Sequence, residues 1–264
     1  MKLYLNSLPK FEEIKWRKIS DEEYDRLKNR FPHFSYDLCP TCGGKKQYKY
    51  RGEIWVCDCK TQIALTRHYL FSNIGRTYHT LGLDDLRDDK GDLKEMIETY
   101  ISKWDSYKRY GRGILFHGPM GTGKTLAQVL ILKELVKKGE KCWFTSFGSA
   151  INAYIDPDEK KAFFTEIREA DCIAIDEVPP AASEKQREFF EEVLEWLVRY
   201  RVENSMPVLL GTNIDMLEAR YPRVASLVSM AFVDFKVDGE DSRRTSSRIN
   251  VDELIENEES RPVK

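Results

Sequence analysis

From residue 113 onward, short apolar runs alternate along the chain with longer amphipathic segments. Short apolar runs bounded by glycine or polar residues are typical of buried strands, whereas apolar positions three and four residues apart are typical of helices. We predict strands over Ile114–Phe116, Lys141–Phe147, Cys172–Val178, Pro207–Asn213 and Phe232–Val237. The segments between them predict helices. One covers Leu126–Lys138, another ends with Phe163–Ala170, a long one covers Glu184–Asn204, and the last lies just before Phe232. This alternation predicts an α/β fold of three layers, with a parallel sheet covered by crossover helices on both faces.

The first half of the chain is more polar, and its patterns are shorter. Ser20-Asp21-Glu22-Glu23 has the Ser-x-x-Glu pattern of a capping box, so we predict a short helix that begins there and stops before Pro32. The stretch Phe71–Leu86 has the character of a linker into the second half. The remaining pattern predicts a hairpin of Gln47–Tyr50 and Glu53–Val56, a helix over Thr61–Leu70 and one helix between Asp84 and Arg112.

A glycine-rich segment directly after the strand Ile114–Phe116 gives the first chemical signal. It fits the P-loop pattern G-x-x-x-x-G-K-[ST] and consists of Gly118, Pro119, Met120, Gly121, Thr122, Gly123, Lys124 and Thr125. Its glycines allow consecutive backbone N–H groups to face one anion, next to the N-terminus of the following helix. We expect Lys124 to reach the β- and γ-phosphates of ATP, and the Thr125 hydroxyl to ligate Mg²⁺. The alternative is a glycine turn that only joins a strand to a helix.

Two other predicted strands end in polar residues. The apolar run from Cys172 delivers Asp176 and Glu177, and we expect Asp176 to hold Mg²⁺ as the Walker B residue. A carboxylate directly after it can accept a proton from an attacking water, which favours ATP hydrolysis with Glu177 as the base. The strand that ends at Asn213 is expected between the P-loop strand and the Walker B strand, as in P-loop ATPases with a glutamate base. Asn213 would then meet the γ-phosphate and the water as a sensor residue.

Arginines beyond that strand include Arg220, Arg223, Arg243 and Arg244. In ring-forming ATPases an arginine of one subunit completes the nucleotide site of the next and stabilises charge on the transferred phosphoryl group. Arg223 is the candidate for this role, with Arg220 as the alternative.

Cysteines form two short pairs in the first half of the chain. Cys39 and Cys42 have the spacing Cys-x-x-Cys, and the predicted hairpin brings Cys57 and Cys59 back to them. Four thiolates that meet in this way are typical of a structural zinc site, a zinc ribbon. Because the second pair is Cys-x-Cys, His68 is an alternative ligand in place of Cys57 or Cys59, and a redox pair is the other interpretation. Two further cysteines lie inside apolar strands and are predicted to be core residues: Cys142 and Cys172.

Composition limits the remaining classes. A chain of 264 residues with 41% hydrophobic residues can bury a sizeable core in one or two domains. The formal net charge of −2 argues against nucleic-acid binding by overall charge alone, although local basic patches can still bind it. Neither a membrane-span pattern nor an apolar signal region after Met1 is found, so we expect a cytoplasmic protein with reduced thiols.

Taken together, the motifs resemble the DnaC/DnaI-like replicative helicase loaders of bacteria and phages, which are AAA+ ATPases of the IstB/DnaC type. The resemblance covers Phe71–Arg244 and rests on five segments in this order: Gly-Pro-Met-Gly-Thr-Gly-Lys-Thr, Ile-Asp-Glu, Gly-Thr-Asn, Arg-Tyr-Pro-Arg-Val and Asp-Ser-Arg-Arg. It implies an AAA+ (ASCE) core that uses ATP and Mg²⁺, with Arg223 in the region of the trans arginine. It also implies that Arg243, or its neighbour Arg244, is the second sensor.

The resemblance further implies the organisation of the chain and its partners. Residues 1–66 are expected to form a helical and zinc-binding region that docks a DnaB-type helicase, 67–244 the AAA+ ATPase domain, and 245–264 a polar, disordered tail. The ATP-bound chain is expected to form a homo-oligomer, a hexameric ring or spiral, on single-stranded DNA. The alternatives are a transposition helper ATPase of the IstB type, acting on duplex DNA, and a nucleotide switch that does not hydrolyse ATP. The zinc ribbon favours the loader over the transposition helper.

Overall fold

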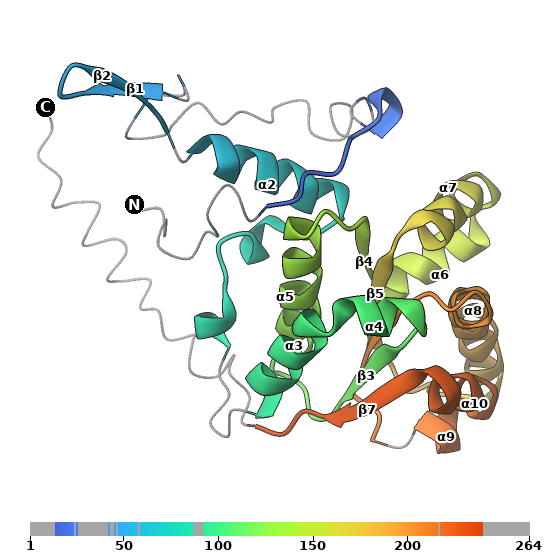
Figure 1. Ribbon diagram of the computed structural model, residues 1–264. Coiled ribbons are helices and arrows are strands. Elements are labelled where there is room, and N and C mark those ends of the chain that lie inside the picture. The colour runs from blue at the N-terminus through green and yellow to red at the C-terminus, as the bar shows by residue number, and fades with distance from the viewer. Residues whose placement is uncertain are drawn as a thin grey trace, which may run out of the picture.

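Five parallel strands form the central sheet of the computed structural model (Figure 1). The strands are β3 (Gly113–His117), β4 (Cys142–Ser146), β5 (Cys172–Val178), β6 (Val208–Thr212) and β7 (Phe232–Lys236), and their order across the sheet is β4-β5-β6-β3-β7. The predicted α/β fold with a parallel sheet is confirmed. Strand β6 lies between β3 and β5, as expected from P-loop ATPases with a glutamate base.

The structure describes residues 14–23, 25, 42, 45, 47–57, 59–86, 92–215 and 217–239. The expected end of the first helix before Pro32 and the expected disordered tail lie outside these residues. At the start of that helix, Glu23 N donates to Ser20 Oγ at 3.2 Å, and Ser20 N donates to the Glu23 carboxylate at 3.0 Å. The predicted capping box is therefore confirmed.

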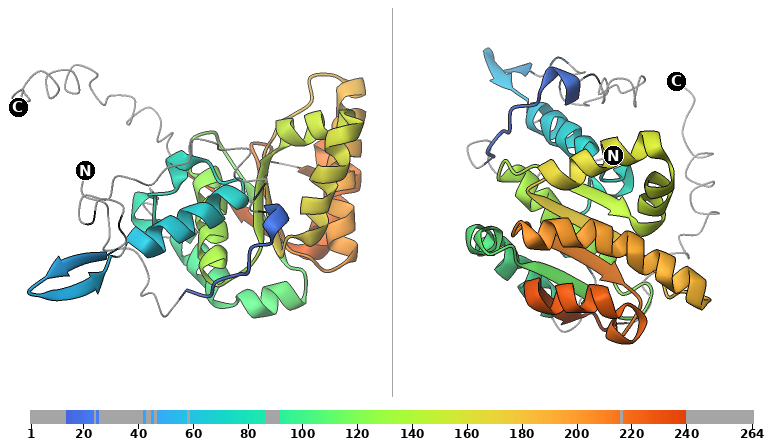
Figure 2. Two further views of the ribbon diagram at one scale, coloured as in Figure 1. Left: turned by 90° about the horizontal axis from the view of Figure 1, so that it is seen from above. Right: turned by 90° about the vertical axis from the view of Figure 1, so that its right-hand side faces the viewer.

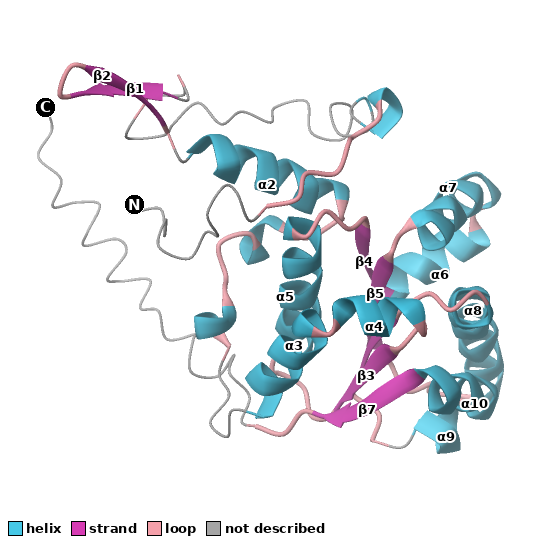
Figure 3. Ribbon diagram, in the orientation of Figure 1, coloured by secondary structure: helices cyan, strands magenta, loops and turns pink. Residues whose placement is uncertain are grey.

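Apolar side chains of the sheet alternate between two cores, one on each face. On β3, Ile114 and Phe116 pack in the first core and Leu115 packs in the second. Figures 2 and 3 show helices on both faces of the sheet. The first face is covered by α2 (Cys59–Phe71), α3 (Asp92–Ser102), α4 (Trp104–Arg109) and α5 (Lys124–Lys137). The second face is covered by α6 (Phe147–Ile155), α7 (Pro157–Glu169), α8 (Glu184–Glu203) and α10 (Pro222–Ala231), with α9 (Leu217–Arg220) before the last of these.

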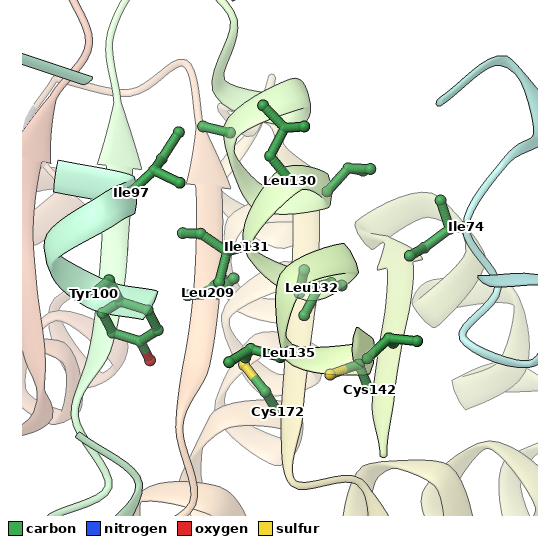
Figure 4. Close-up of a cluster of buried hydrophobic side chains, with 14 of the residues drawn as sticks. Ile74, Ile97, Tyr100, Leu130, Ile131, Leu132, Leu135, Cys142, Cys172 and Leu209 are labelled. Carbon is green, nitrogen blue, oxygen red and sulfur yellow. The ribbon is translucent and has the colours of Figure 1, made fainter. Parts of the chain in front are cut away.

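Helix α5 lies at the centre of the first core, where it contacts the sheet and both α2 and α3. Figure 4 shows its buried side chains near those of α3. The apolar side chains of α5 include Ile131 and Leu135, both fully buried. Cys142 and Cys172 are paired across β4 and β5, and both are buried in this core. The prediction that these two cysteines are core residues is confirmed.

Two predictions of secondary structure were wrong. The single helix expected between Asp84 and Arg112 is two helices, α3 and α4, which are separated at Lys103. The strand expected to run to Phe147 ends at Ser146. There the Ser146 hydroxyl accepts a hydrogen bond from Ser149 N at 3.1 Å and caps α6, a helix that the apolar pattern did not separate from the strand.

The predicted hairpin is confirmed, and it is joined to the core by a helix. Strands β1 (Gln47–Tyr50) and β2 (Glu53–Val56) pair antiparallel, with Tyr50 opposite Glu53. Helix α2 follows, and its residues Leu65 and Tyr69 are buried in the first core. Two 3-10 turns, Arg76–Tyr78 and Leu83–Asp85, lead from α2 towards α3 in the stretch that the sequence marks as a linker. Among the described helices, none is long and apolar enough to cross a membrane.

Candidate nucleotide site

The carboxyl ends of β3, β5 and β6 meet at one edge of the sheet, because neighbouring strands of a parallel sheet end on the same side. A cavity lies at this edge. Its lining includes the start of α5 and the ends of β5 and β6: Lys124, Thr125, Asp176, Glu177, Thr212 and Asn213. The structure thus brings together the P-loop, the two carboxylates and the predicted sensor residue, which are far apart in the sequence.

Glycines shape the loop between β3 and α5. Gly121 and Gly123 have φ values of 77° and 100°, in the left-handed region that glycine adopts without strain. Gly118 has a different constraint, because a Cβ atom at this position would lie only 2.3 Å from the carbonyl oxygen of Val237, just after β7. The P-loop backbone therefore depends on glycine both for its turns and for its approach to the edge strand.

Lys124 opens helix α5, and its side chain is folded into the loop. Only 7% of the residue is exposed. Its Nζ donates to the carbonyl oxygen of Gly118 at 2.8 Å and also to that of Pro119. The Thr122 hydroxyl donates to the same Pro119 oxygen at 3.0 Å. These bonds hold a buried ammonium group beside the backbone N–H groups at the start of the helix.

Asp176 meets the first turn of α5. The Thr125 hydroxyl donates to its Oδ2 at 2.5 Å. The aspartate is 4% exposed, and burial raises the pKa of its carboxyl group above the usual value, although the Thr125 hydrogen bond acts in the opposite direction. A buried carboxylate next to a hydroxyl offers two oxygen ligands of the kind that Mg²⁺ prefers. A cation there would stabilise the ionised form that burial disfavours.

Two residues without a predicted role support Asp176, namely Gln128 and Gly211. Gln128 is fully buried on α5, and its amide fits between β5 and β6 when it is oriented for hydrogen bonding. Its nitrogen is then 3.1 Å from Asp176 Oδ1, and its oxygen is 2.8 Å from Gly211 N. Gly211 itself leaves room for the carboxylate, because a Cβ atom there would lie 2.3 Å from Asp176 Oδ1. Helix α5 and strand β6 therefore both fix the position of the Asp176 carboxylate.

Glu177 is aimed differently from Asp176 because the strand is irregular at this point. The pairing of β5 with β6 shifts register between Ile175 and Val178, and Glu177 has a φ of 59°. Residues held in the left-handed region without being glycine carry strain, and such strain is concentrated at functional sites. The Thr212 hydroxyl donates to the Val178 carbonyl oxygen at 2.9 Å and keeps β6 attached beyond the bulge. As a result Glu177 is exposed and lines the cavity, while Asp176 is buried.

The predicted arginines do not line this cavity in the part of the chain that the structure describes. Arg223 lies at the start of α10, where its Nε is 3.3 Å from Glu191 and its Nη1 is 3.4 Å from Glu195, both on α8. Its backbone N–H also donates to Glu191 at 2.7 Å. Arg220 is exposed at the end of α9. Arg243 and Arg244 lie outside the described residues.

Three of the four predicted zinc ligands come together at the base of the hairpin. The Sγ atoms of Cys42, Cys57 and Cys59 lie within 4.8 Å of one another, and all three residues are buried. Cys39 lies outside the described residues. His68 is not part of this group, since its Nδ1 is 2.9 Å from the Ala64 carbonyl oxygen and its Nε2 is 3.5 Å from that of Arg17. The donor set, three converging thiols, has the chemistry of a structural zinc site.

Sequence reasoning missed two contributors to the nucleotide site, Tyr78 and Gln128, and it gave Gly211 no role of its own. Gln128 did leave a signal, because it is a polar residue one helical turn after Lys124 in the otherwise apolar run from Leu126 to Leu132. Gly211 is a glycine inside a predicted buried strand, which suggests a close approach of another group. Tyr78 lies in the linker-like stretch Phe71–Leu86, and no local sequence pattern there predicts that it lines the cavity.

Comparison with known proteins supports the fold. Residues 114–232 match the family model described as "ATPase family associated with various cellular activities (AAA)". The fold is similar to the structure described as "Crystal structure of the DnaC helicase loader", with a TM-score of 0.53 and 18% identity over 62% of this chain and 100% of that chain. For DnaI the TM-score is 0.51, with 16% identity over 63% of this chain and 93% of that chain. For the replication initiator DnaA bound to AMPPCP and single-stranded DNA it is 0.50, with 16% identity over 72% of this chain and 58% of that chain.

The close approach of Asp176 to β6 gives a direct test of this site. Gly211→Ala should displace the Asp176 carboxylate and lower Mg²⁺-dependent ATP hydrolysis by roughly 10- to 100-fold, as for other disturbed outer partners of metal ligands. The matched control is Gly148→Ala on α6, where an added Cβ atom would meet nothing closer than Ser146 Oγ at 3.9 Å. Steady-state phosphate release measures both variants. A rate for Gly211→Ala equal to that of the control would show that the position of Asp176 does not matter.

Proposed function

Because the chain contains an AAA ATPase domain, we propose that it is an ATP-dependent loader that delivers a DnaB-type replicative helicase to single-stranded DNA. Likeness of its fold to the DnaC helicase loader supports this role. The observation that carries the proposal is the cavity where Lys124, Asp176 and Glu177 meet, since a loader that uses ATP needs a site that both binds and hydrolyses it.

Nucleotide binding is assigned to the P-loop and the residues beside it. Backbone N–H groups of residues 118–123 surround the phosphates, and Lys124 exchanges its carbonyl partners for the β- and γ-phosphate oxygens. The Thr125 hydroxyl and the Asp176 carboxylate are the protein groups that would hold Mg²⁺, and their hard oxygen donors fit this ion. Mg²⁺, when bound, screens the negative charge of the β- and γ-phosphates.

Hydrolysis is assigned to Glu177 and Asn213. Glu177 accepts a proton from a water molecule, whose oxygen forms the new bond to the γ-phosphorus as the bond to the β–γ bridging oxygen breaks. Asn213, at the end of β6, holds that water or a γ-phosphate oxygen by hydrogen bonds from its amide. The left-handed backbone of Glu177 serves this role because it turns the carboxylate into the cavity instead of into the sheet.

Other copies of the chain complete the site in this proposal. The ATP-bound chain forms a hexameric ring or spiral on single-stranded DNA, and Arg223 of one copy contacts the γ-phosphate of the next, with Arg220 as the alternative. The Arg223 side chain, which is 55% exposed, must then leave Glu191 and Glu195, while its backbone N–H can keep the buried Glu191 carboxylate hydrogen-bonded at 2.7 Å. Arg243, or Arg244, is proposed as the second sensor.

The cysteine group is proposed to hold structural zinc, with Cys39 as the fourth ligand to Cys42, Cys57 and Cys59. Among the described residues, the three buried thiols converge in a small cluster with Ile63 and Tyr48, and zinc–thiolate bonds stabilise small ribbons of this kind. The zinc holds the hairpin β1–β2 in place. The exposed apolar residues of that hairpin, Tyr50, Ile54, Trp55 and Val56, then form the surface that docks the helicase.

The roles of Lys124 and Glu177 can be separated by substitution. Lys124→Ala should abolish productive ATP binding, because it removes the cation of the phosphate site. Glu177→Gln should bind ATP with nearly unchanged affinity and lose at least about 100-fold in turnover, because only the proton acceptor is removed. Calorimetric titration with ATP and phosphate-release assays measure the two effects. Equal loss of binding in both variants would contradict the assigned roles.

The zinc site predicts about one zinc ion per chain in protein purified without chelator. Cys59→Ser should lower the zinc content and loosen the hairpin region, while Cys142→Ser, a buried cysteine of the central sheet, should leave the zinc content unchanged. Atomic-emission analysis gives the stoichiometry. Protein without zinc would refute the site, and full zinc retention in Cys59→Ser would restore His68 as a ligand.

The loader role is tested by copurification with a DnaB-type helicase. Ile54→Glu and Trp55→Glu place a charge on opposite faces of the hairpin, and at least one should abolish helicase binding while ATP-dependent binding of single-stranded DNA persists. Met230→Glu is the control, since Met230 is 67% exposed on α10. If both hairpin variants still bind helicase but lose DNA binding, the hairpin is a nucleic-acid module and the docking proposal is wrong.

A further inference from the structure

Lys133 is a buried lysine on helix α5. It follows the run from Val129 to Leu132 on α5, and only 5% of it is exposed. Burying an ammonium group is costly unless it finds hydrogen-bond acceptors. Lys133 Nζ donates to the carbonyl oxygens of Tyr78 at 2.9 Å and His79 at 3.1 Å, and also to that of Leu81. Three acceptors from one short segment, residues 78–81, therefore surround a single side chain.

The surroundings of Lys133 lower its pKa but leave the side chain mostly charged at neutral pH. Burial lowers the pKa of Lys133 to about 8, with Lys137 acting in the same direction and Glu134 and Asp85 opposing it. At neutral pH the group is still mostly protonated, so all three of its N–H bonds are available. The ring of Tyr69 lies 5.3 Å from the ammonium nitrogen and closes the site on the side of α2.

The segment that Lys133 binds, residues 78–81, includes a residue of the nucleotide cavity. Tyr78, the last residue of the 3-10 turn Arg76–Tyr78, lines the same cavity as Lys124 and Asp176. It contributes the aromatic ring among the described residues of that lining. Aromatic rings bind nucleobases by stacking, which is favourable for every base. The N-terminus of α5 thus forms part of the phosphate site at Lys124. Lys133, nine residues later on the same helix, binds the segment that carries Tyr78.

We propose that Lys133 is a positioning residue that holds the Tyr78 ring at the nucleotide cavity, where the ring contacts the base of the bound nucleotide. This inference rests on the proposed nucleotide site and adds to it the residues that recognise the base. Lys133 itself does not touch the nucleotide. Its effect passes through the three carbonyl groups, which set the path of residues 78–81 and so the position of the ring.

Comparison of ATP with inorganic tripolyphosphate tests the inference, because the two ligands share phosphates and differ in the nucleoside. The full-length chain should bind ATP more tightly than tripolyphosphate in calorimetric titrations with Mg²⁺. Lys133→Met keeps the apolar stem of the side chain and removes its donors. This variant should lose about tenfold in affinity for ATP and nothing for tripolyphosphate. Lys137→Met, which removes the same charge one turn later on α5, should bind both ligands as the unaltered chain does.

Variants of Tyr78 keep the test decisive even if Lys133→Met unfolds. Tyr78→Ala should reproduce the selective loss for ATP, and Tyr78→Phe should restore ATP binding because it keeps the ring. The double variant Lys133→Met/Tyr78→Ala should bind ATP no more weakly than Tyr78→Ala alone, since both changes remove one contact.

Three results would overturn the inference. They are an equal loss of ATP and tripolyphosphate binding in Lys133→Met, additive losses in the double variant, and full ATP affinity in Tyr78→Ala. Equal affinity of the unaltered chain for ATP and tripolyphosphate would show that the base adds no affinity, and it would not contradict the proposed phosphate site. Failure of the unaltered chain to bind either ligand would instead refute the proposed nucleotide site itself.

Discussion

The short hydrogen bond from Thr125 to Asp176 joins the first turn of α5 to the end of β5, and the rest of the site depends on it. It forms because β6 carries Gly211 at the point where the aspartate needs room, and because the buried Gln128 amide fills the remaining gap. The same helical turn begins with Lys124, so fixing Thr125 also fixes the lysine. A buried carboxylate with a raised pKa, a hydroxyl and an ammonium group are thereby held around one cavity before any ligand arrives. Such preorganisation is what electrostatic catalysis requires.

Much of this arrangement could be predicted from the sequence because its signals are local. An apolar run followed by glycines and Lys-Thr, and another followed by two carboxylates, show strand ends and their chemistry without any tertiary information. The place of β6 between β3 and β5 was expected from the arrangement in P-loop ATPases with a glutamate base, and it is confirmed.

Features that depend on contacts between distant residues could not be predicted in this way. Glu177 turns outward because of a bulge between β5 and β6, which the run of residues 172–178 does not reveal. Arg201 gave no signal either: it is fully buried on α8 and donates to four backbone carbonyl groups, of which those of Ala170 and Pro207 flank β5 and β6. Helix α6 was missed because Phe147 continues the apolar pattern of β4, and only the hydroxyl cap at Ser146 ends the strand.

The first half of the chain is attached to the nucleotide site through packed helices. Cys59 is the first residue of α2, and Tyr69 near its other end is buried in the core formed around α5. Lys133 connects α5 to the segment that follows α2. Helix α2 also runs through residue 66, the boundary expected between the two regions, so the cysteine group and the P-loop are joined by continuous packing. In the proposed loader, ATP binding and helicase docking would therefore act on one connected core.

ATP turnover by the unaltered chain in the presence of single-stranded DNA tests the central claim most directly. The account predicts that one Mg·ATP binds per chain, that phosphate is released, and that DNA raises the rate because it promotes assembly of adjoining copies. Removal of Mg²⁺ by EDTA should stop the release. One-to-one binding of Mg·ATP without phosphate release, both with and without DNA, would contradict the account and leave a nucleotide switch in its place.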